Sequence, residues 1–252
     1  MRADALAVVL ATFSVWGCDD VFGIDHVDPP GCRNGSADED LDGVIDGCDP
    51  CPADPEDLPV DTDRDQVDDV CDPNPDTFGD SIVLFDGFTT DLHYQTTTQS
   101  WGHSDDGTYK QGLAVESRSI VAIDAASNVT LDVLFSQLGD KPGTGGGVSL
   151  TLGPGNGTEV DCMMVRPDGL EVIVAGAAGT RVPFAVKTSA RVRLHELTDG
   201  SFSCDATTPE GEAATATGPA GPMPEVTAIG FRSASAPIVM TSVTVFDTSG
   251  SR

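Results

Sequence analysis

The chain has 252 residues, and its 41 acidic side chains outnumber 13 basic ones, which gives a formal net charge of -28 at pH 7. This charge excludes a nucleic-acid-binding protein, because each phosphate contact needs a cationic side chain. It also excludes docking on an anionic membrane through a basic patch. The longest apolar stretch, residues 5–16, is shorter than the roughly 20 residues that span a bilayer, so we expect no membrane-spanning helix. Plentiful glycine and proline, 28 and 17 residues, favour short strands and turns over helices.

The first 17 residues have the composition of an export signal. A single basic residue, Arg2, precedes a short apolar stretch and a small residue, Gly17, which is the pattern of a secretory signal peptide. The sequence Val15-Trp16-Gly17-Cys18 resembles a bacterial lipobox. The resemblance implies that Cys18 is lipidated and becomes the first residue of the mature protein. Trp16 departs from that pattern, since its position usually holds a small residue. The alternative is an ordinary signal peptide cut elsewhere, which leaves Cys18 as a spare thiol.

The cysteine count agrees with export. Besides Cys18 the chain has six cysteines, an even number, as expected for an exported chain whose disulfides are closed. We therefore expect an exported protein that is held at the bacterial outer membrane or cell surface through its lipid anchor alone.

The acidic charge is concentrated in the first part of the mature chain. Residues 18–80 hold 21 acidic and two basic residues, whereas residues 81–252 hold 19 and ten. Residues 32–76 contain few large aliphatic side chains and no aromatic one, so this segment cannot bury enough apolar surface to offset the entropy of ordering it. It is therefore either disordered or held by metal ions and disulfides. Residues 18–31 before it are expected to form a tether.

One acidic pattern occurs twice within this segment. Residues 38–49 and residues 61–72, which begin 23 positions apart, both have Asp at positions 1, 3, 5, 9 and 12 and Cys at position 11. Positions 1, 3, 5, 7, 9 and 12 surround calcium in an EF-hand loop, with position 7 contributing its backbone carbonyl. No amphipathic helix flanks either copy, so an EF-hand itself is not expected. The alternative is a solvated acidic linker, but a second match at a fixed offset with the same cysteine favours calcium sites.

The pattern resembles thrombospondin type 3 repeats over about residues 32–76, where Asp-x-Asp-x-Asp-Gly-x-x-Asp-x-Cys-Asp-x-Cys-Pro is followed by a second Asp-x-Asp-x-Asp. The resemblance implies a segment with almost no regular secondary structure that wraps around calcium ions. It also implies a disulfide ladder of Cys32–Cys48 and Cys51–Cys71. Gln66 replaces the turn glycine of the first copy, which puts the geometry of the second loop in question because glycine tolerates positive φ. The expected calcium ligands are Asp38, Asp40, Asp42, Val44, Asp46 and Asp49 in one site and Asp61, Asp63, Asp65, Val67, Asp69 and Asp72 in the other.

Residues 80–248 have the pattern of an all-β domain, an antiparallel β-sandwich or jelly roll. Apolar or alternating stretches are separated by turn signals such as residues 166–169 and 198–200. Cys162 and Cys204 lie on two such stretches and are expected to pair across the sheet or at its edge. The expected strands cover residues 82–88, 119–123, 129–135, 147–152, 159–165, 169–174, 190–197, 201–205, 226–231 and 239–246.

The order of these features resembles the concanavalin-like jelly rolls, the group that holds laminin-G-like and lectin-like domains. The chain has Trp101 on the early strands and closes with apolar stretches over residues 229–233 and 242–247. This fold hosts both binding proteins and glycosidases. The glycosidases of the family carry a Glu-x-Asp-x(x)-Glu strand with paired carboxylates. Here Glu159-Val-Asp161 is followed by Cys162-Met-Met, so we expect that the chain is not an enzyme.

Taken together, these patterns predict an exported, calcium-binding protein for adhesion or recognition at the cell envelope. The expected partner is a glycan or an envelope or matrix protein. Trp101, Tyr94 and Tyr109 are candidates to stack on a sugar ring, with a core position as the alternative for Trp101. A glycan hydrolase of the same fold and a purely structural envelope protein are the alternative functions. The oligomeric state does not follow from the sequence.

Overall fold

The computed structural model describes residues 37–55, 60–89, 94–97, 101–104, 107–111, 117–138, 147–153, 159–165, 169–184, 189–221, 225–234 and 236–251. The expected signal peptide and tether, together with Cys18 and Cys32, lie outside these residues. Among the residues described, no helix is long and apolar enough to cross a membrane.

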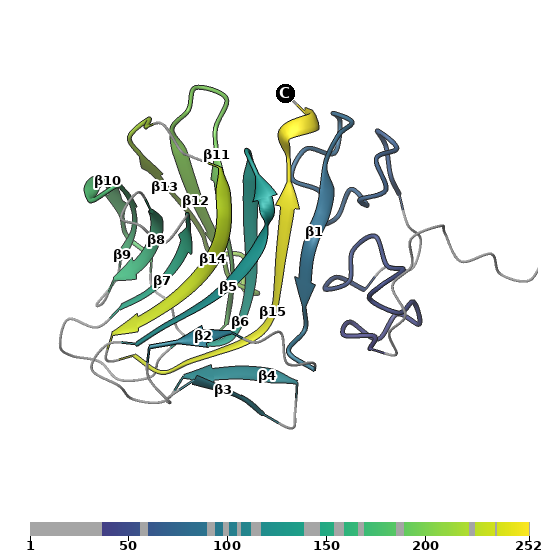
Figure 1. Ribbon diagram of the computed structural model, residues 1–252, viewed down its shortest axis with the longest axis horizontal. Helices are drawn as coiled ribbons and strands as arrows, with labels where there is room; N and C mark the ends of the chain where they lie inside the picture. Colours follow the sequence, from purple (N-terminus) through teal and green to yellow (C-terminus); the bar gives the residue numbers. More distant parts are fainter. Residues whose placement is uncertain are drawn as a thin grey trace, which may run out of the picture.

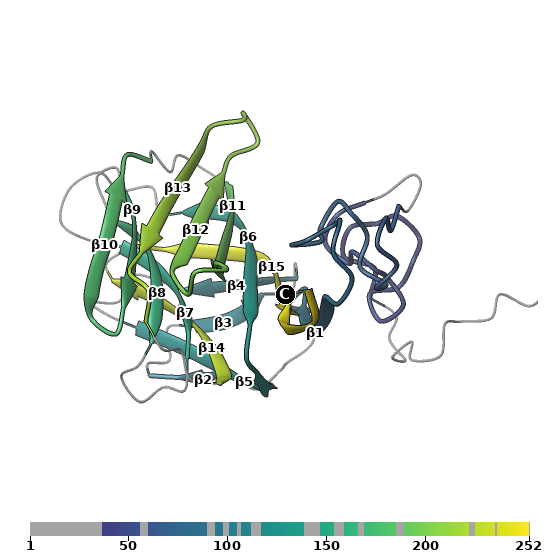
Figure 2. The same ribbon diagram turned by 90° about the horizontal axis from the view of Figure 1, so that it is seen from above.

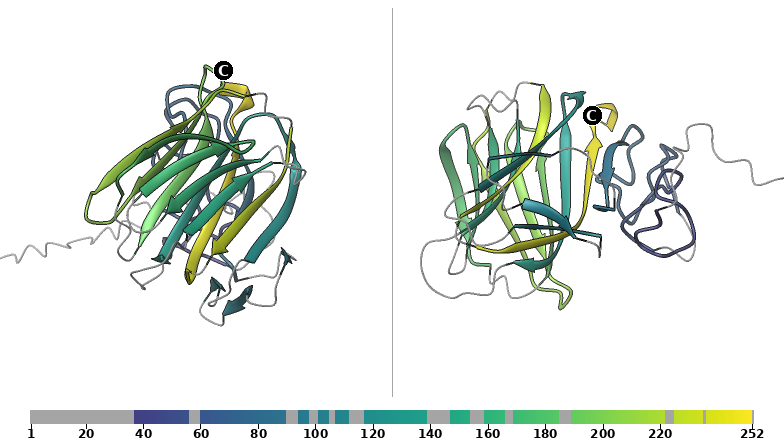
Figure 3. Two further views of the ribbon diagram at one scale, coloured as in Figure 1. Left: turned by 90° about the vertical axis from the view of Figure 1, so that its left-hand side faces the viewer. Right: turned by 60° about the horizontal axis from the view of Figure 1, so that its bottom comes forward.

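Two antiparallel sheets pack face to face, which confirms the predicted β-sandwich (Figure 1 and Figure 3). Sheet A has the strand order β13 (Ala213–Gly218), β12 (Phe202–Thr207), β11 (Ala190–Glu196), β6 (Val129–Leu138), β15 (Ile238–Asp247), β4 (Thr108–Gln111) and β3 (Trp101–Ser104), and β1 (Ser81–Asp86) also pairs with β15. Sheet B has the order β10 (Ala177–Val182), β9 (Gly169–Val174), β8 (Val160–Val165), β7 (Gly147–Leu152), β14 (Val226–Ala234), β5 (Ser117–Ala126) and β2 (Gln95–Thr96). The chain ends in a short 3-10 helix, Ser249–Ser251.

The core lies between the sheets and follows from the alternation of side chains along each strand. On β11, Val192 and Leu194 are fully buried, whereas Arg191 and Arg193 point to the outer face of sheet A. Burying each aliphatic side chain of this size contributes roughly 1.5–3 kcal/mol. The predicted disulfide between Cys162 of β8 and Cys204 of β12 is present. This disulfide crosses the core and joins the two sheets. We had expected it across one sheet or at a sheet edge.

The acidic segment that precedes β1, here called the repeat segment (residues 37–80), lies beside β1 and β15 (Figure 1 and Figure 2). Residues 37–55 and 60–80 contain no helix or strand, in line with the irregular segment that we expected. The predicted Cys51–Cys71 disulfide is present. Together with Val67, this disulfide is buried against Phe246 of β15 and forms a small second core.

Two arginines fasten the repeat segment to the outer face of sheet A. The buried carboxylate of Asp132 on β6 accepts hydrogen bonds from both Arg191 and Arg193. Arg191 also pairs with Asp54 of the repeat segment, and Nη2 of Arg193 donates to the backbone carbonyl of Cys71 at 3.0 Å. The repeat segment is therefore held by buried apolar contacts and by charged hydrogen bonds to one sheet.

Candidate metal centre and ligand sites

The two acidic loops, residues 38–49 and residues 61–72, have the same internal hydrogen bonds. The amide of position 5 donates to the carboxylate of position 3 at 3.1 Å in the first loop and 3.2 Å in the second. The amide of position 6 donates to the carboxylate of position 1, at 3.2 Å in the first loop and 3.0 Å in the second. The amide of position 7 donates to the carboxylate of position 5, at 2.7 Å in the first loop and 3.0 Å in the second. The amide of position 2 donates to position 9 at 3.0 and 2.8 Å. The sequence repeat is therefore also a repeat of backbone geometry.

Both loops use left-handed backbone at positions 4 and 6. The φ angles are 66° at Leu41 and 99° at Gly43 in the first loop, and 72° at Arg64 and 81° at Gln66 in the second. Gln66 thus adopts the conformation that Gly43 adopts in the first loop, although a side chain makes it less favourable. The substitution of the turn glycine does not change the course of the second loop.

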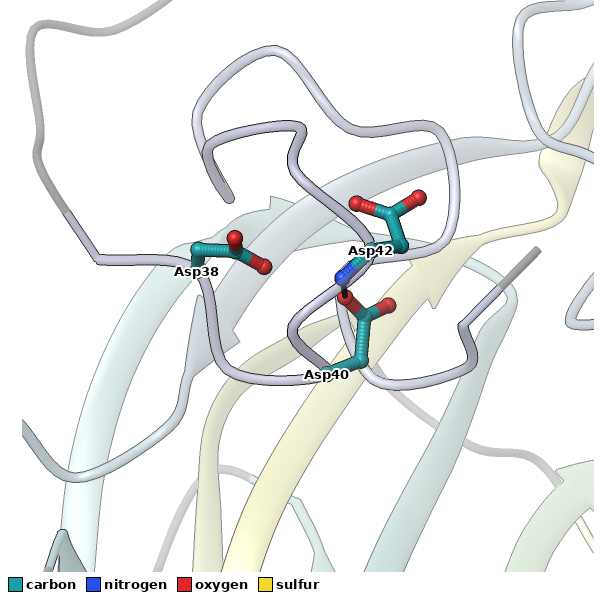
Figure 4. Close-up of side chains that lie close together, drawn as sticks. All are labelled: Asp38, Asp40 and Asp42. Carbon is teal, nitrogen blue, oxygen red and sulfur yellow. Dashed lines mark hydrogen bonds between the residues drawn. The ribbon is translucent and has the colours of Figure 1, made fainter. Parts of the chain in front are cut away.

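The side chains at positions 1, 3 and 5 converge in each loop, as Figure 4 shows for the first. One carboxylate oxygen from each residue lies within 4.8 Å of the others. The two groups are Asp38, Asp40 and Asp42 in the first loop and Asp61, Asp63 and Asp65 in the second.

Several carboxylate oxygens of these loops are buried and have no hydrogen-bond partner. At position 3, Oδ2 of Asp40 and Oδ2 of Asp63 are in this state, and so is Oδ1 of Asp38 at position 1. A buried carboxylate oxygen without a donor carries a large free-energy cost. Oxygen ligands close together on a turning backbone are what calcium prefers. The donor set therefore fits a bound calcium ion.

The remaining expected ligands do not all join these groups. At position 9, Asp69 accepts hydrogen bonds from the amide and the hydroxyl of Thr62, which lower the pKa of its carboxyl. At position 12, the amide two residues later donates to one oxygen of Asp49 and of Asp72. The other oxygen, Oδ2, is buried without a partner in both residues, and burial raises the pKa of each carboxyl to about 7. Positions 9 and 12 therefore lie outside the groups that positions 1, 3 and 5 form, and the full ligand set of each loop stays a prediction.

The first loop keeps the hydrogen bond at position 9, but the two loops differ in the pKa shift at position 9 and in the exposure of position 7. Asp46 accepts the amide of Glu39, and burial raises the pKa of its carboxyl. At position 7, Val44 is exposed and Val67 is buried. Cys48 is disulfide-bonded, and its expected partner, Cys32, lies outside the described residues.

The three aromatic candidates for stacking on a sugar pack against one another, and Trp101 has the core position that was the alternative for it. Trp101 is 8 % exposed and Tyr109 is 2 % exposed. Their rings stack at a centroid distance of 5.3 Å, and Tyr94 stacks on Tyr109 at 4.8 Å. The hydroxyl of Tyr94 donates to Asp86 at 2.8 Å. These rings belong to the core of the sandwich, so they do not present an open platform to a ligand.

A polar groove of about 530 Å³ lies between the second loop and the outer face of sheet A. The second loop and the residues after it contribute Val70 and Asn74 to one wall, and β11 and β12 contribute Arg193, His195 and Asp205 to the other. Nδ1 of His195 lies 3.6 Å from Oδ2 of Asp205, and burial lowers the pKa of His195. The volume of the groove is that of ordinary small-molecule sites. Sequence reasoning missed this groove because its walls come from distant parts of the chain.

A second polar patch lies on the outer face of sheet B. Asp161 of β8 accepts a hydrogen bond from Thr151 at 2.6 Å, and burial raises the pKa of its carboxyl. Glu159 pairs with Arg118 of β5. The register places Glu171 of β9 opposite Met163 of β8, so Glu171 shares this face with Asp161. Glu171 therefore does not stand alone, as it does in the sequence.

No known family model matches the chain, and no curated protein matches it significantly. The chain is similar to the solved structure of the lectin UEA-II complexed with galactose, at 11 % identity and a TM-score of 0.52, over 67 % of this chain and 98 % of the lectin. It is also similar to a prokaryotic beta-1,3-1,4-glucanase (lichenase) derived from a mouse hindgut metagenome, at 11 % identity, 67 % and 99 % coverage and a TM-score of 0.49. A third similar structure is the carbohydrate binding module CBM66 from Bacillus subtilis, at 11 % identity, 60 % and 94 % coverage and a TM-score of 0.46.

The likeness to the lectin shows the fold, which is a jelly roll, and this fold corrects one expectation from the sequence. We expected that the chain is not an enzyme because the Glu159-Val-Asp161 run lacks a third carboxylate. This fold hosts both binding proteins and glycosidases. The incomplete run is therefore not sufficient to exclude an enzyme.

Proposed function

We propose that the repeat segment binds calcium and that the jelly roll attached to it recognises carbohydrate. The observation that carries the calcium proposal is the matched geometry of the two loops, in which three carboxylates converge and some of their buried oxygens accept no hydrogen bond from the described residues. Asp38, Asp40 and Asp42 hold one ion, and Asp61, Asp63 and Asp65 hold another. The ions neutralise carboxylates that otherwise repel one another. An affinity on the order of 10⁻⁴ to 10⁻³ M suits an extracellular module.

Neutralising position 3 of each loop tests the calcium proposal. We expect Asp40→Asn and Asp63→Asn each to weaken calcium binding by at least tenfold at one loop, as followed by isothermal titration calorimetry of the full chain. Asp76→Asn is the matched control, because Asp76 is exposed and lies outside both carboxylate groups. Unchanged titrations for both loop variants would show that these carboxylates do not hold the metal.

The groove beside the second loop supports carbohydrate as the ligand of the sandwich. Its walls offer an amide, an imidazole, a carboxylate and a guanidinium within one groove, and such groups bind sugar hydroxyls through directed hydrogen bonds. Fold similarity to a lectin agrees with this proposal but does not identify a site. We expect the full chain to bind members of a glycan array, and we expect His195→Ala to abolish that binding while Glu171→Gln leaves it intact. Binding that survives His195→Ala would place the site elsewhere.

A glycan hydrolase is the second candidate function, and the patch on sheet B favours it. Glu159, Asp161 and Glu171 bring three carboxylates to one face, and glycoside hydrolysis needs two. Release of reducing sugar from β-glucans by the full chain, and its loss in Glu159→Gln and Glu171→Gln, would support this function. Absence of release from a broad panel would leave the binding function as the better account.

We also propose that the protein is exported and held at the cell surface by a lipid on Cys18, with no other contact to the membrane. The support is the sequence pattern of residues 1–18. Stable anchoring needs two acyl chains or an equivalent second signal. Because the lipid on Cys18 is the sole membrane contact that we propose, its loss should release the protein. Cys18→Ser should therefore move it to the soluble export fraction, and unchanged membrane association with an unchanged lipid label would refute the anchor.

A further inference from the structure

Three buried carboxylates meet where the repeat segment joins the first strand of the sandwich. One carboxylate oxygen from each of Asp65, Asp72 and Asp80 lies within 4.8 Å of the other two. The three residues are 8 %, 5 % and 2 % exposed. Asp80 belongs to neither acidic loop, because it lies eight residues after the second loop ends and directly precedes β1. This group therefore connects the loop to the sandwich.

The hydrogen bonds around the group leave two oxygens unsatisfied. Oδ2 of Asp65 accepts the amides of Gly79 at 3.1 Å and Asp80 at 2.6 Å. Asn74 donates its side-chain amide to Oδ2 of Asp80 and its backbone amide to Oδ1 of Asp72. Oδ1 of Asp80 and Oδ2 of Asp72 are buried and accept no hydrogen bond from the residues that the structure describes.

Among the described residues, no basic side chain donates a hydrogen bond to these three carboxylates. The hydrogen bonds that described residues give to the three carboxylates come from backbone amides and from the Asn74 amide. Burying ionised carboxylates is costly unless a cation or several donors neutralise them. The group offers oxygen atoms alone, which suit a hard divalent cation such as calcium.

We propose that Asp65, Asp72 and Asp80 form a further calcium site, which locks the repeat segment to strand β1. This proposal rests on calcium binding by the second loop, since Asp65 also belongs to the group formed with Asp61 and Asp63. The carboxylate of Asp65 bridges the two ion positions. Binding of the second ion then fixes residues 72–80 and, through Asp80, the start of β1, which pairs with β15.

Titration of the full chain with calcium tests the site. We expect Asp80→Asn to bind one ion fewer than the wild-type protein while uptake at the two loops persists. Asp76→Asn, an exposed aspartate four residues earlier, is the control and should bind as many ions as the wild type. An unchanged number of ions in Asp80→Asn overturns the proposal and leaves calcium binding by the loops standing. A wild-type protein that binds no calcium overturns both.

Hydrogen exchange on the wild-type protein gives a test that does not depend on how the variant folds. Calcium should slow exchange of the Gly79 and Asp80 amides by at least tenfold, because both donate to Asp65. The amide of Ser203 on β12, distant from the junction in chain and sheet, should exchange at the same rate with and without calcium. Equal exchange of Gly79 and Asp80 in calcium and in chelator overturns the proposal.

Discussion

Arg191 of β11 and Asp54 of the repeat segment form an ion pair across 137 residues of sequence, with Nη1 2.9 Å from Oδ2. The same guanidinium donates through Nε to the buried Asp132 of β6. The repeat segment is therefore attached to the sandwich by a charge network that is partly shielded from water, and its order depends on sheet A.

Replacing Arg191 should loosen this attachment. We expect Arg191→Ala to lower the free energy of unfolding by about 2 kcal/mol, because it removes hydrogen bonds between charged groups. We also expect it to speed proteolysis within residues 37–80. Thermal unfolding and limited proteolysis measure the two effects. Arg181→Ala is the control, because Arg181 is exposed on the edge strand β10. Equal behaviour of the two variants would mean that Arg191 does not hold the segment.

Exchanging glycine and glutamine at position 6 of the two loops tests their shared left-handed backbone. Gln66 has a φ of 81° and Gly43 has a φ of 99°, and a side chain there costs about 1 kcal/mol relative to glycine. Gln66→Gly should therefore stabilise the second loop, and Gly43→Gln should destabilise the first. Calcium affinity of each variant, measured by calorimetry, should rise in the former and fall in the latter. Changes of the same sign would contradict the shared loop geometry.

The Cys51–Cys71 disulfide should be essential for order in the repeat segment. The bond spans 20 positions, and closing a loop of this length stabilises the folded state by about 3 kcal/mol in the loop-entropy model. We expect the double variant Cys51→Ser, Cys71→Ser to expose Val67 and to lose protection from hydrogen exchange over residues 60–80, while β6 and β11 keep theirs. Loss of protection throughout the sandwich would show instead that the segment is needed for the whole fold.

The metal-free repeat segment should be more stable in mild acid than in base. Burial raises the pKa of Asp49 and of Asp72 to about 7, above their value in an unfolded chain. At these two groups the folded state binds more protons, so their contribution to stability is fully present below about pH 4 and is lost as the pH rises through about 7. Proteolysis of residues 37–80 in chelator should be faster at pH 8 than at pH 5. Calcium should reverse this order, because it binds the ionised carboxylates, and slower proteolysis at pH 8 in chelator would contradict the assignment.

The sequence predicts the sandwich and the two described disulfides well because each depends on a local pattern. Alternation along β11 and buried stretches such as β7 identify their strands directly. The strands that were missed lack this signal. β10 and β13 are rich in alanine and glycine, and β2 and β4 are two and four residues long. The conformation of these strands is decided by pairing with their neighbours and not by their own propensity.

The arrangement of the carboxylates was predicted only in part, for a physical reason. Spacing identifies positions 1, 3 and 5, which converge within one turn of the loop. Spacing does not show that the carboxylate of position 9 accepts a hydrogen bond from the amide of position 2. It also does not show that the carboxylates of Asp72 and Asp80 lie close together. Those relationships depend on how the repeat segment packs on sheet A. The burial of Trp101 likewise follows from tertiary packing and not from the sequence around it.

Equilibrium dialysis of the full chain against millimolar calcium, followed by elemental analysis of the protein, tests the central claim most directly. The account predicts at least two calcium ions per chain at pH 7.5, together with fewer ions in the double variant Asp40→Asn, Asp63→Asn. No calcium above the level of the dialysis buffer in the wild-type protein would contradict it.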